Sequence, residues 1–133
     1  MVMRAVRYVG LMGIVAGLLM AAAGAPQTTL KGVLIDKRCS YDAKTRVMAG
    51  PRLVGGMVVA YTHTRECALK PECQRSGYGV FTYDQEFVPF DADGNEKALA
   101  FFQNTDKQDD FRVQVTGRME GEVMHVASIE LPP

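Results

Sequence analysis

Residues 110–131 read DFRVQVTGRMEGEVMHVASIEL, and this stretch predicts a β-hairpin near the end of the chain. In its first half the apolar side chains of Phe111, Val113 and Val115 alternate with polar ones, and a similar alternation follows Gly121. A period of two residues is typical of strands with one buried face. The hairpin is therefore expected to turn at the glycine and to present one apolar face to a core.

Upstream of the hairpin the sequence predicts one helix and three more strands. Residues 95–105 (NEKALAFFQNT) form an amphipathic pattern that begins with Asn95, a good N-cap. Two short aromatic-rich strands are expected over 77–84 and 86–92, joined by a tight turn. The first strand is expected over 28–39 (TTLKGVLIDKRC).

The resulting order is strand, long insertion, strand, strand, helix, strand, strand, which is mostly β with α insertions. Five strands with one helix between the third and the fourth is the order of the OB-fold, a small Greek-key barrel. We therefore expect a five-stranded OB-like barrel with a long, partly helical insertion, residues 40–77, between strands 1 and 2. The alternative is an open α+β sandwich built from the same elements.

The first 25 residues have the pattern of a secretory signal peptide. Arg4 and Arg7 make a basic start, residues 9–20 are apolar, and the small residues of AAAGA follow. We expect residues 1–25 to be removed and residues 26–133 to form a single domain in the periplasm or outside the cell.

The composition of the expected mature chain excludes several classes of function. Without residues 1–25 it has 108 residues, with 13 of the 15 basic residues and all 15 acidic ones, a formal net charge of −2. This size fits one domain with a modest core. Nucleic acid is not an expected partner, because a slightly acidic domain lacks the basic surface that binds phosphates. No stable membrane insertion is expected after cleavage, and no catalytic pair of residues can be named.

Four side chains in and beside the insertion have the chemistry of metal ligands. Residues 63–73 read HTRECALKPEC and contain His63, Cys67 and Cys73, and the remaining cysteine of the chain is Cys39. Cys39 ends the predicted first strand, and Cys73 comes shortly before the second. We therefore expect these side chains to lie together where the insertion joins the barrel.

Two uses of these cysteines remain open. In an exported protein, one disulfide from Cys39 to Cys67 or Cys73 would close the insertion and contribute about 2–4 kcal/mol, with one thiol left over. Alternatively, three thiolates and the His63 imidazole make a set of ligands suited to Zn²⁺, and the thiolates alone would suit Cu⁺. The sequence does not choose between them.

The predicted second and third strands offer a different kind of site. An OB barrel usually binds its ligands with the face of these strands. Aromatic side chains that can lie there are Tyr78, Phe81, Tyr83 and Phe87, which would hold a peptide, a glycan or an envelope protein. The function expected from the sequence is thus a small, non-catalytic, exported binding or accessory module stapled by cysteines. A metal-binding protein is the alternative.

Several short motifs together resemble those of a known group of domains. They are the GVLID strand followed by a cysteine, the HTRECAL and CQRSGYGV segments, and the closing hairpin. In combination they resemble small exported bacterial OB-fold-like domains, over most of residues 30–131. The resemblance implies an exported OB-like domain and no particular activity.

Overall fold

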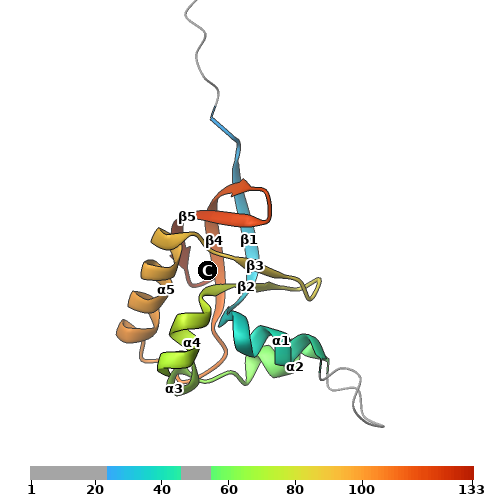
Figure 1. The fold of residues 1–133 in the computed structure, drawn as a ribbon, viewed down its shortest axis with the longest axis vertical. Helices are drawn as coiled ribbons and strands as arrows, with labels where there is room; N and C mark the ends of the chain where they lie inside the picture. Colours follow the sequence, from blue (N-terminus) through green and yellow to red (C-terminus); the bar gives the residue numbers. More distant parts are fainter. Residues whose placement is uncertain (1–23, 46–54) are drawn as a thin grey trace, which may run out of the picture.

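The computed structural model describes residues 24–45 and 55–133, so nearly all of the predicted signal peptide 1–25 lies outside the described residues. The described chain forms five strands and five helices (Figure 1). In chain order they are β1 (Gln27–Asp36), α1 (Lys37–Thr45), α2 (Gly56–Tyr61), α3 (Arg65–Ala68), α4 (Pro71–Ser76), β2 (Tyr78–Thr82), β3 (Phe87–Pro89), α5 (Ala92–Asn104), β4 (Arg112–Glu120) and β5 (Val123–Glu130). None of the helices in these two ranges is long and apolar enough to cross a membrane.

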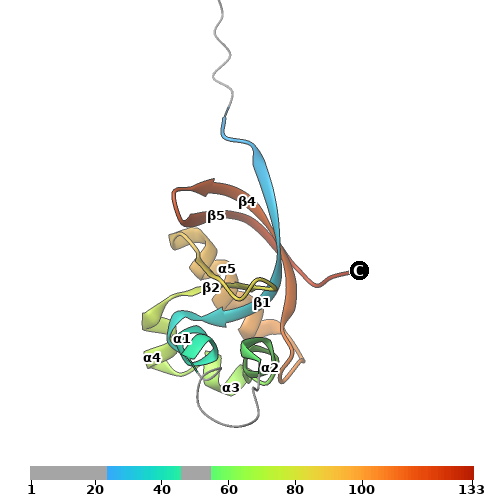
Figure 2. The ribbon, with the colours of Figure 1, turned by 90° about the vertical axis from the view of Figure 1, so that its right-hand side faces the viewer.

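The five strands of the described chain form one antiparallel sheet in the order β3-β2-β1-β4-β5, and the fold is mixed α+β. The central strand, β1, pairs with β4 from Gln27 to Val33 and with β2 from Gly32 to Asp36. This overlap lets one long strand serve two partners, and Figure 2 shows the sheet curving strongly along it. Because Asp36 pairs with Tyr78, the end of β1 lies beside the start of β2.

The sheet is not closed into a barrel, and in this respect the predicted OB-like barrel differs from the structure. In the described chain the two edge strands approach each other at an isolated parallel bridge between Phe90 and Met124. There the N–H of Asp91 donates to the carbonyl of Met124 at 3.0 Å. β3 has only three residues, so it offers little backbone for further pairing with β5.

The helices lie in two places. α1, α2, α3 and α4 all belong to the connection between β1 and β2 and gather at one end of the sheet (Figures 1 and 2). The predicted insertion 40–77 is thus partly helical where it is described, as expected, but the first strand ends at Asp36 and Cys39 already belongs to α1. α5 packs against β2 and β5, on the side towards which the sheet curves.

The alternation predicted for the hairpin is confirmed. Phe111, Val113 and Val115 are buried, and Arg112 between them is exposed. Gly121 has a φ of 60°, the left-handed conformation that a turn between two strands favours. The hairpin therefore supplies one apolar face to a core shared with β1, β2 and α5.

The helix predicted over 95–105 exists but begins earlier, because Asp91 rather than Asn95 is its N-cap. Oδ1 of Asp91 accepts from the N–H of Gly94 at 2.9 Å. Asn95 lies in the second turn, where its Oδ1 accepts from the N–H of Tyr78 at 2.6 Å. A helix has one N-cap residue, whose side chain accepts an N–H of the first turn. Asp91 has that position here, so Asn95 falls inside the helix.

The predicted aromatic ligand face is not formed as a set. Tyr78 and Phe81 are 2% and 0% exposed, so both belong to the core, and the Tyr78 hydroxyl donates to the carbonyl of Ala68 at 2.7 Å. Phe87 is half-buried against the same core. Only Tyr83 of the four, at 51% exposed, offers a large accessible ring.

Candidate functional site

Cys39 is placed by the junction of β1 and α1. The strand ends at Asp36, whose Oδ1 accepts from the N–H of Cys39 at 2.9 Å, as an N-cap carboxylate does. The N–H of Lys37 donates to the carbonyl of Gly77 at 2.8 Å, which ties the start of α1 to the start of β2. Cys39 therefore lies in the first turn of a helix fixed at the end of the sheet.

The other two cysteines are placed by the short helices α3 and α4. Thr64 caps α3, and its Oγ1 accepts from the N–H of Cys67 at 3.1 Å. Pro71 is the first residue of α4, a position that suits its fixed φ and missing N–H, and Cys73 follows in the first turn at 3% exposed. His63 lies in the connection between α2 and α3, with its side chain 4% exposed.

These helices bring the four predicted ligands into two overlapping groups. One ligand atom each of Cys39, His63 and Cys67 lie within 4.8 Å of one another, as do those of Asp36, Cys39 and Cys73. The Sγ atoms of Cys39 and Cys67 are 3.6 Å apart. All three cysteines are free thiols in the structure, with no disulfide between them.

Asp36 belongs to this site although the sequence did not single it out. It is fully buried, and its Oδ2 lies 2.9 Å from Nε2 of His63, an ion-pair distance. The two atoms are not aligned for a hydrogen bond, and Nδ1 of His63 has no hydrogen-bond partner among the described residues. The site thus contains a buried imidazole with one nitrogen against a carboxylate and the other without a partner.

The electrostatics of the site favour a cation. Burial works to raise the pKa of Asp36, but the contact with His63 and the N–H of Cys39 outweigh it and lower the pKa below its usual range. Burial and the nearby charge of Asp36 raise the pKa of the Cys39 thiol, and the same causes raise the pKa of Cys73 to about 11. Asp36 therefore carries a negative charge inside the site, and that charge together with burial favours the neutral form of the Cys39 and Cys73 thiols until a cation binds.

One side of the site opens into a pocket of about 270 Å³. Cys39, His63 and Cys67 line it, together with residues of α1 and α2 and of the loop that precedes α3. Cys39 and Cys67 are half-exposed there, whereas Cys73 does not line the pocket. Solvent and small molecules can therefore reach two of the three sulfur atoms.

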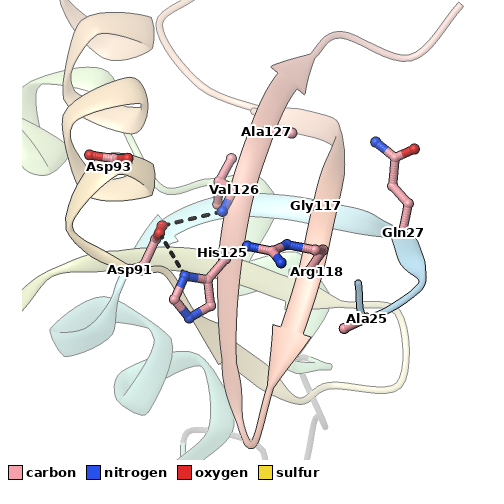
Figure 3. A pocket seen from close by; sticks show the side chains of 9 residues that line it. All are labelled: Ala25, Gln27, Asp91, Asp93, Gly117, Arg118, His125, Val126 and Ala127. Carbon is pink, nitrogen blue, oxygen red and sulfur yellow. Dashed lines mark hydrogen bonds and ion pairs between the residues drawn. The ribbon is translucent and has the colours of Figure 1, made fainter. Parts of the chain in front are cut away.

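A second, larger pocket of about 410 Å³ lies between the start of α5 and the β4–β5 hairpin (Figure 3). His125 is a half-buried residue of β5 that lies here, with Nδ1 3.2 Å from Asp91 and Nε2 2.7 Å from Glu120. Asp91 also accepts from the N–H of Val126 at 3.2 Å. These contacts fasten the N-terminus of α5 to β5, which is a structural role.

Asp91 is expected to contribute stability that depends on pH. Burial works to raise its pKa, but hydrogen bonds from Gly94 and Val126 and the charge of His125 outweigh it and lower the pKa below its usual range. The contribution is thus complete above the unfolded-state pKa and is lost as the pH falls through the folded-state pKa. Asp91→Ala should cost about 0.5–2 kcal/mol at neutral pH.

Urea unfolding at several pH values checks this expectation. Asp91→Asn can still cap the helix, but it should flatten the acid side of the stability profile, because the ionisable group is gone. Asp93→Asn, in the same first turn, is the matched control and should follow the wild type. Equal acid slopes in the wild type and Asp91→Asn would contradict the assignment.

Comparison of the chain with protein-family models, with curated proteins and with solved structures gives no match.

Proposed function

We propose that this is an exported metal-binding protein in which Cys39, Cys67, Cys73 and His63 hold one soft d¹⁰ ion, Zn²⁺ or Cu⁺. The observation that carries the proposal is the state of His63. Its imidazole is almost completely buried, yet Nδ1 has no hydrogen-bond partner among the described residues, and the sulfur atoms of Cys39 and Cys67 each lie within 4.8 Å of a ring nitrogen. A buried nitrogen without a partner is costly, and a metal–nitrogen bond removes that cost.

The contact between Asp36 and His63 supports the same function. Metal-binding histidines usually hold a carboxylate or a carbonyl with the ring nitrogen that does not bind the metal. Nε2 of His63 lies 2.9 Å from Asp36, which leaves Nδ1 for an ion. Asp36 thereby orients the ring and adds negative charge that favours a cation.

The spacing of the sulfur atoms also supports a metal. Two thiolates on one tetrahedral Zn²⁺, with Zn–S bonds of about 2.3 Å, lie about 3.8 Å apart. Sγ of Cys39 and Sγ of Cys67 are 3.6 Å apart, close to that value. The distance between these two sulfur atoms is thus compatible with their binding one ion, with Cys73, which lies within 4.8 Å of Cys39, as a third thiolate.

A disulfide staple between Cys39 and Cys67 is the second candidate, and the same 3.6 Å separation favours it. On that alternative the domain is the non-catalytic envelope module expected from the sequence, and its ligand would be a peptide, a glycan or a partner protein. The strand order and the helix between β3 and β4 also support an OB-like origin for the open sheet.

Intact mass of the reduced, purified protein tests the proposal. After Zn²⁺ or Cu⁺ is offered and excess is removed, the native mass should show one ion, which disappears on denaturation, and all three thiols should then be alkylated. His63→Gln should lose most of the metal, whereas the matched variant His125→Gln, which alters the histidine outside the site, should retain it. A reduced protein that takes up neither ion would overturn the proposal.

A further inference from the structure

The pair formed by Cys39 and Cys67 has a second chemical use. From its geometry we infer that these two thiols are a redox couple, and that their oxidation to a disulfide releases the bound metal. This inference rests on the proposed function, and it adds regulation of that same site by disulfide-containing oxidants.

The first support is the short distance between the two sulfur atoms. Sγ of Cys39 lies 3.6 Å from Sγ of Cys67, so a disulfide needs the two sulfur atoms to approach by about 1.5 Å. The two cysteines come from different helices, α1 and α3, and lie far apart in the chain. A disulfide between them would therefore link α1 to α3 covalently and fix how these two helices pack.

The second support is access. Cys39 and Cys67 are half-exposed and line the pocket of about 270 Å³, whereas Cys73 is 3% exposed and lies outside it. An oxidant that enters the pocket meets only these two sulfur atoms. The position of Cys73 thus selects which pair is oxidised.

The oxidant in this reaction is a small-molecule or protein disulfide, XS–SX. One cysteine of the pair gives up its proton to water, or its bond to the ion, and the resulting thiolate attacks XS–SX, forms a mixed disulfide and expels XS⁻. The second thiolate then attacks the mixed disulfide, forms the bond between Cys39 and Cys67 and expels a second XS⁻. The protein loses two electrons, XS–SX gains them, and the two XS⁻ products take protons from water.

Oxidation removes two of the four proposed ligands. Disulfide sulfur is a poor ligand because the thiolate, not the oxidised form, binds the metal. Cys73 and His63 remain, and two ligands do not complete the tetrahedral set that a structural zinc site uses. The expected result is loss of the ion when the pair is oxidised.

The test uses the metal-loaded protein in buffers of increasing oxidised-to-reduced glutathione ratio. Bound metal is read with a colorimetric chelator, and disulfide linkage is read by peptide mass spectrometry. Bound metal should fall more than tenfold as the Cys39–Cys67 disulfide forms, with the same midpoint for both readouts. Reduction should restore binding.

Two variants identify the couple. Cys73→Ser keeps the pair but removes one proposed metal ligand. Because bound metal holds the pair reduced, this variant should form the Cys39–Cys67 disulfide at a glutathione ratio equal to or lower than that of the metal-loaded wild type. Cys67→Ser cannot form it and should keep whatever metal it binds as the ratio rises. Metal that stays bound to the wild type at every ratio, or a disulfide that joins Cys73, would overturn the inference.

The outcomes also separate this inference from the function on which it rests. A reduced protein that takes up no ion contradicts both. A protein that takes up one ion and keeps it under oxidising conditions contradicts only the redox couple.

Discussion

Replacing Phe102 with alanine is expected to lower the free energy of unfolding by about 3–5 kcal/mol, a large part of the 5–15 kcal/mol typical of a small domain. Phe102 lies on the buried side of α5 and is 0% exposed. Its ring centroid is 4.9 Å from that of Phe111, at 84°, and 5.3 Å from that of Tyr78. The substitution therefore removes contacts to β2 and to the residue that directly precedes β4, and it leaves a cavity between helix and sheet.

Urea unfolding followed by circular dichroism measures this effect. Phe101→Ala is the matched control, because Phe101 is the preceding residue of the same helix but is only half-buried. It should cost clearly less than Phe102→Ala. Similar losses for the two variants would show that helix propensity, rather than core packing, dominates at these positions.

The hairpin was predictable from sequence because its two strands and its turn are local in the chain. The alternation of Phe111, Val113 and Val115 defines a buried face without knowledge of the partners. β2 was harder, because residues 78–81 are all buried. It lies between two strands, with α5 on one face and α1 close by, so alternation could not show that Tyr78 and Phe81 belong to the core.

Barrel closure was not predictable, because it depends on how far two edge strands pair after the chain has folded. β3 contains a proline at position 89, which has no N–H to donate, and the pairing of this edge with β5 in the described chain is an isolated bridge from Phe90, just after β3, to Met124. The order of elements is the same for the open and the closed arrangement. Sequence patterns therefore gave the strands but not the closure.

The candidate site was predictable in part. Cys39 and Cys73 flank the strands whose ends pair at Asp36 and Tyr78, so topology alone indicated that they lie near each other. Asp36 itself gave no signal, because an aspartate at the end of a strand is usually an exposed cap. Its buried carboxylate contacts His63, and a contact between side chains so distant in the chain has no local pattern.

Because Asp36 is completely buried, its removal is expected to lower the free energy of unfolding. Asp36→Ala leaves the imidazole of His63 buried without a partner and removes the acceptor for the N–H of Cys39. Breaking a buried pair in this way typically costs about 3–5 kcal/mol. Asp106→Ala, at an exposed position, is the matched control and should leave the free energy of unfolding nearly unchanged in the same urea experiment.

Measurements of metal affinity show whether Asp36 positions His63 for the ion or only stabilises the fold. Asp36→Asn keeps an acceptor for Cys39 but loses the charge that faces Nε2, and loss of such a partner typically weakens metal binding about 10–100-fold. The milder core variant Phe102→Leu should destabilise the protein and leave the affinity of the folded form unchanged. Asp36→Glu, which retains the carboxylate, should recover part of the affinity. Competition with a chelator of known affinity measures all three variants. If Asp36→Asn binds the ion as tightly as the wild type, the carboxylate acts only on folding, and the imidazole is held in place by packing.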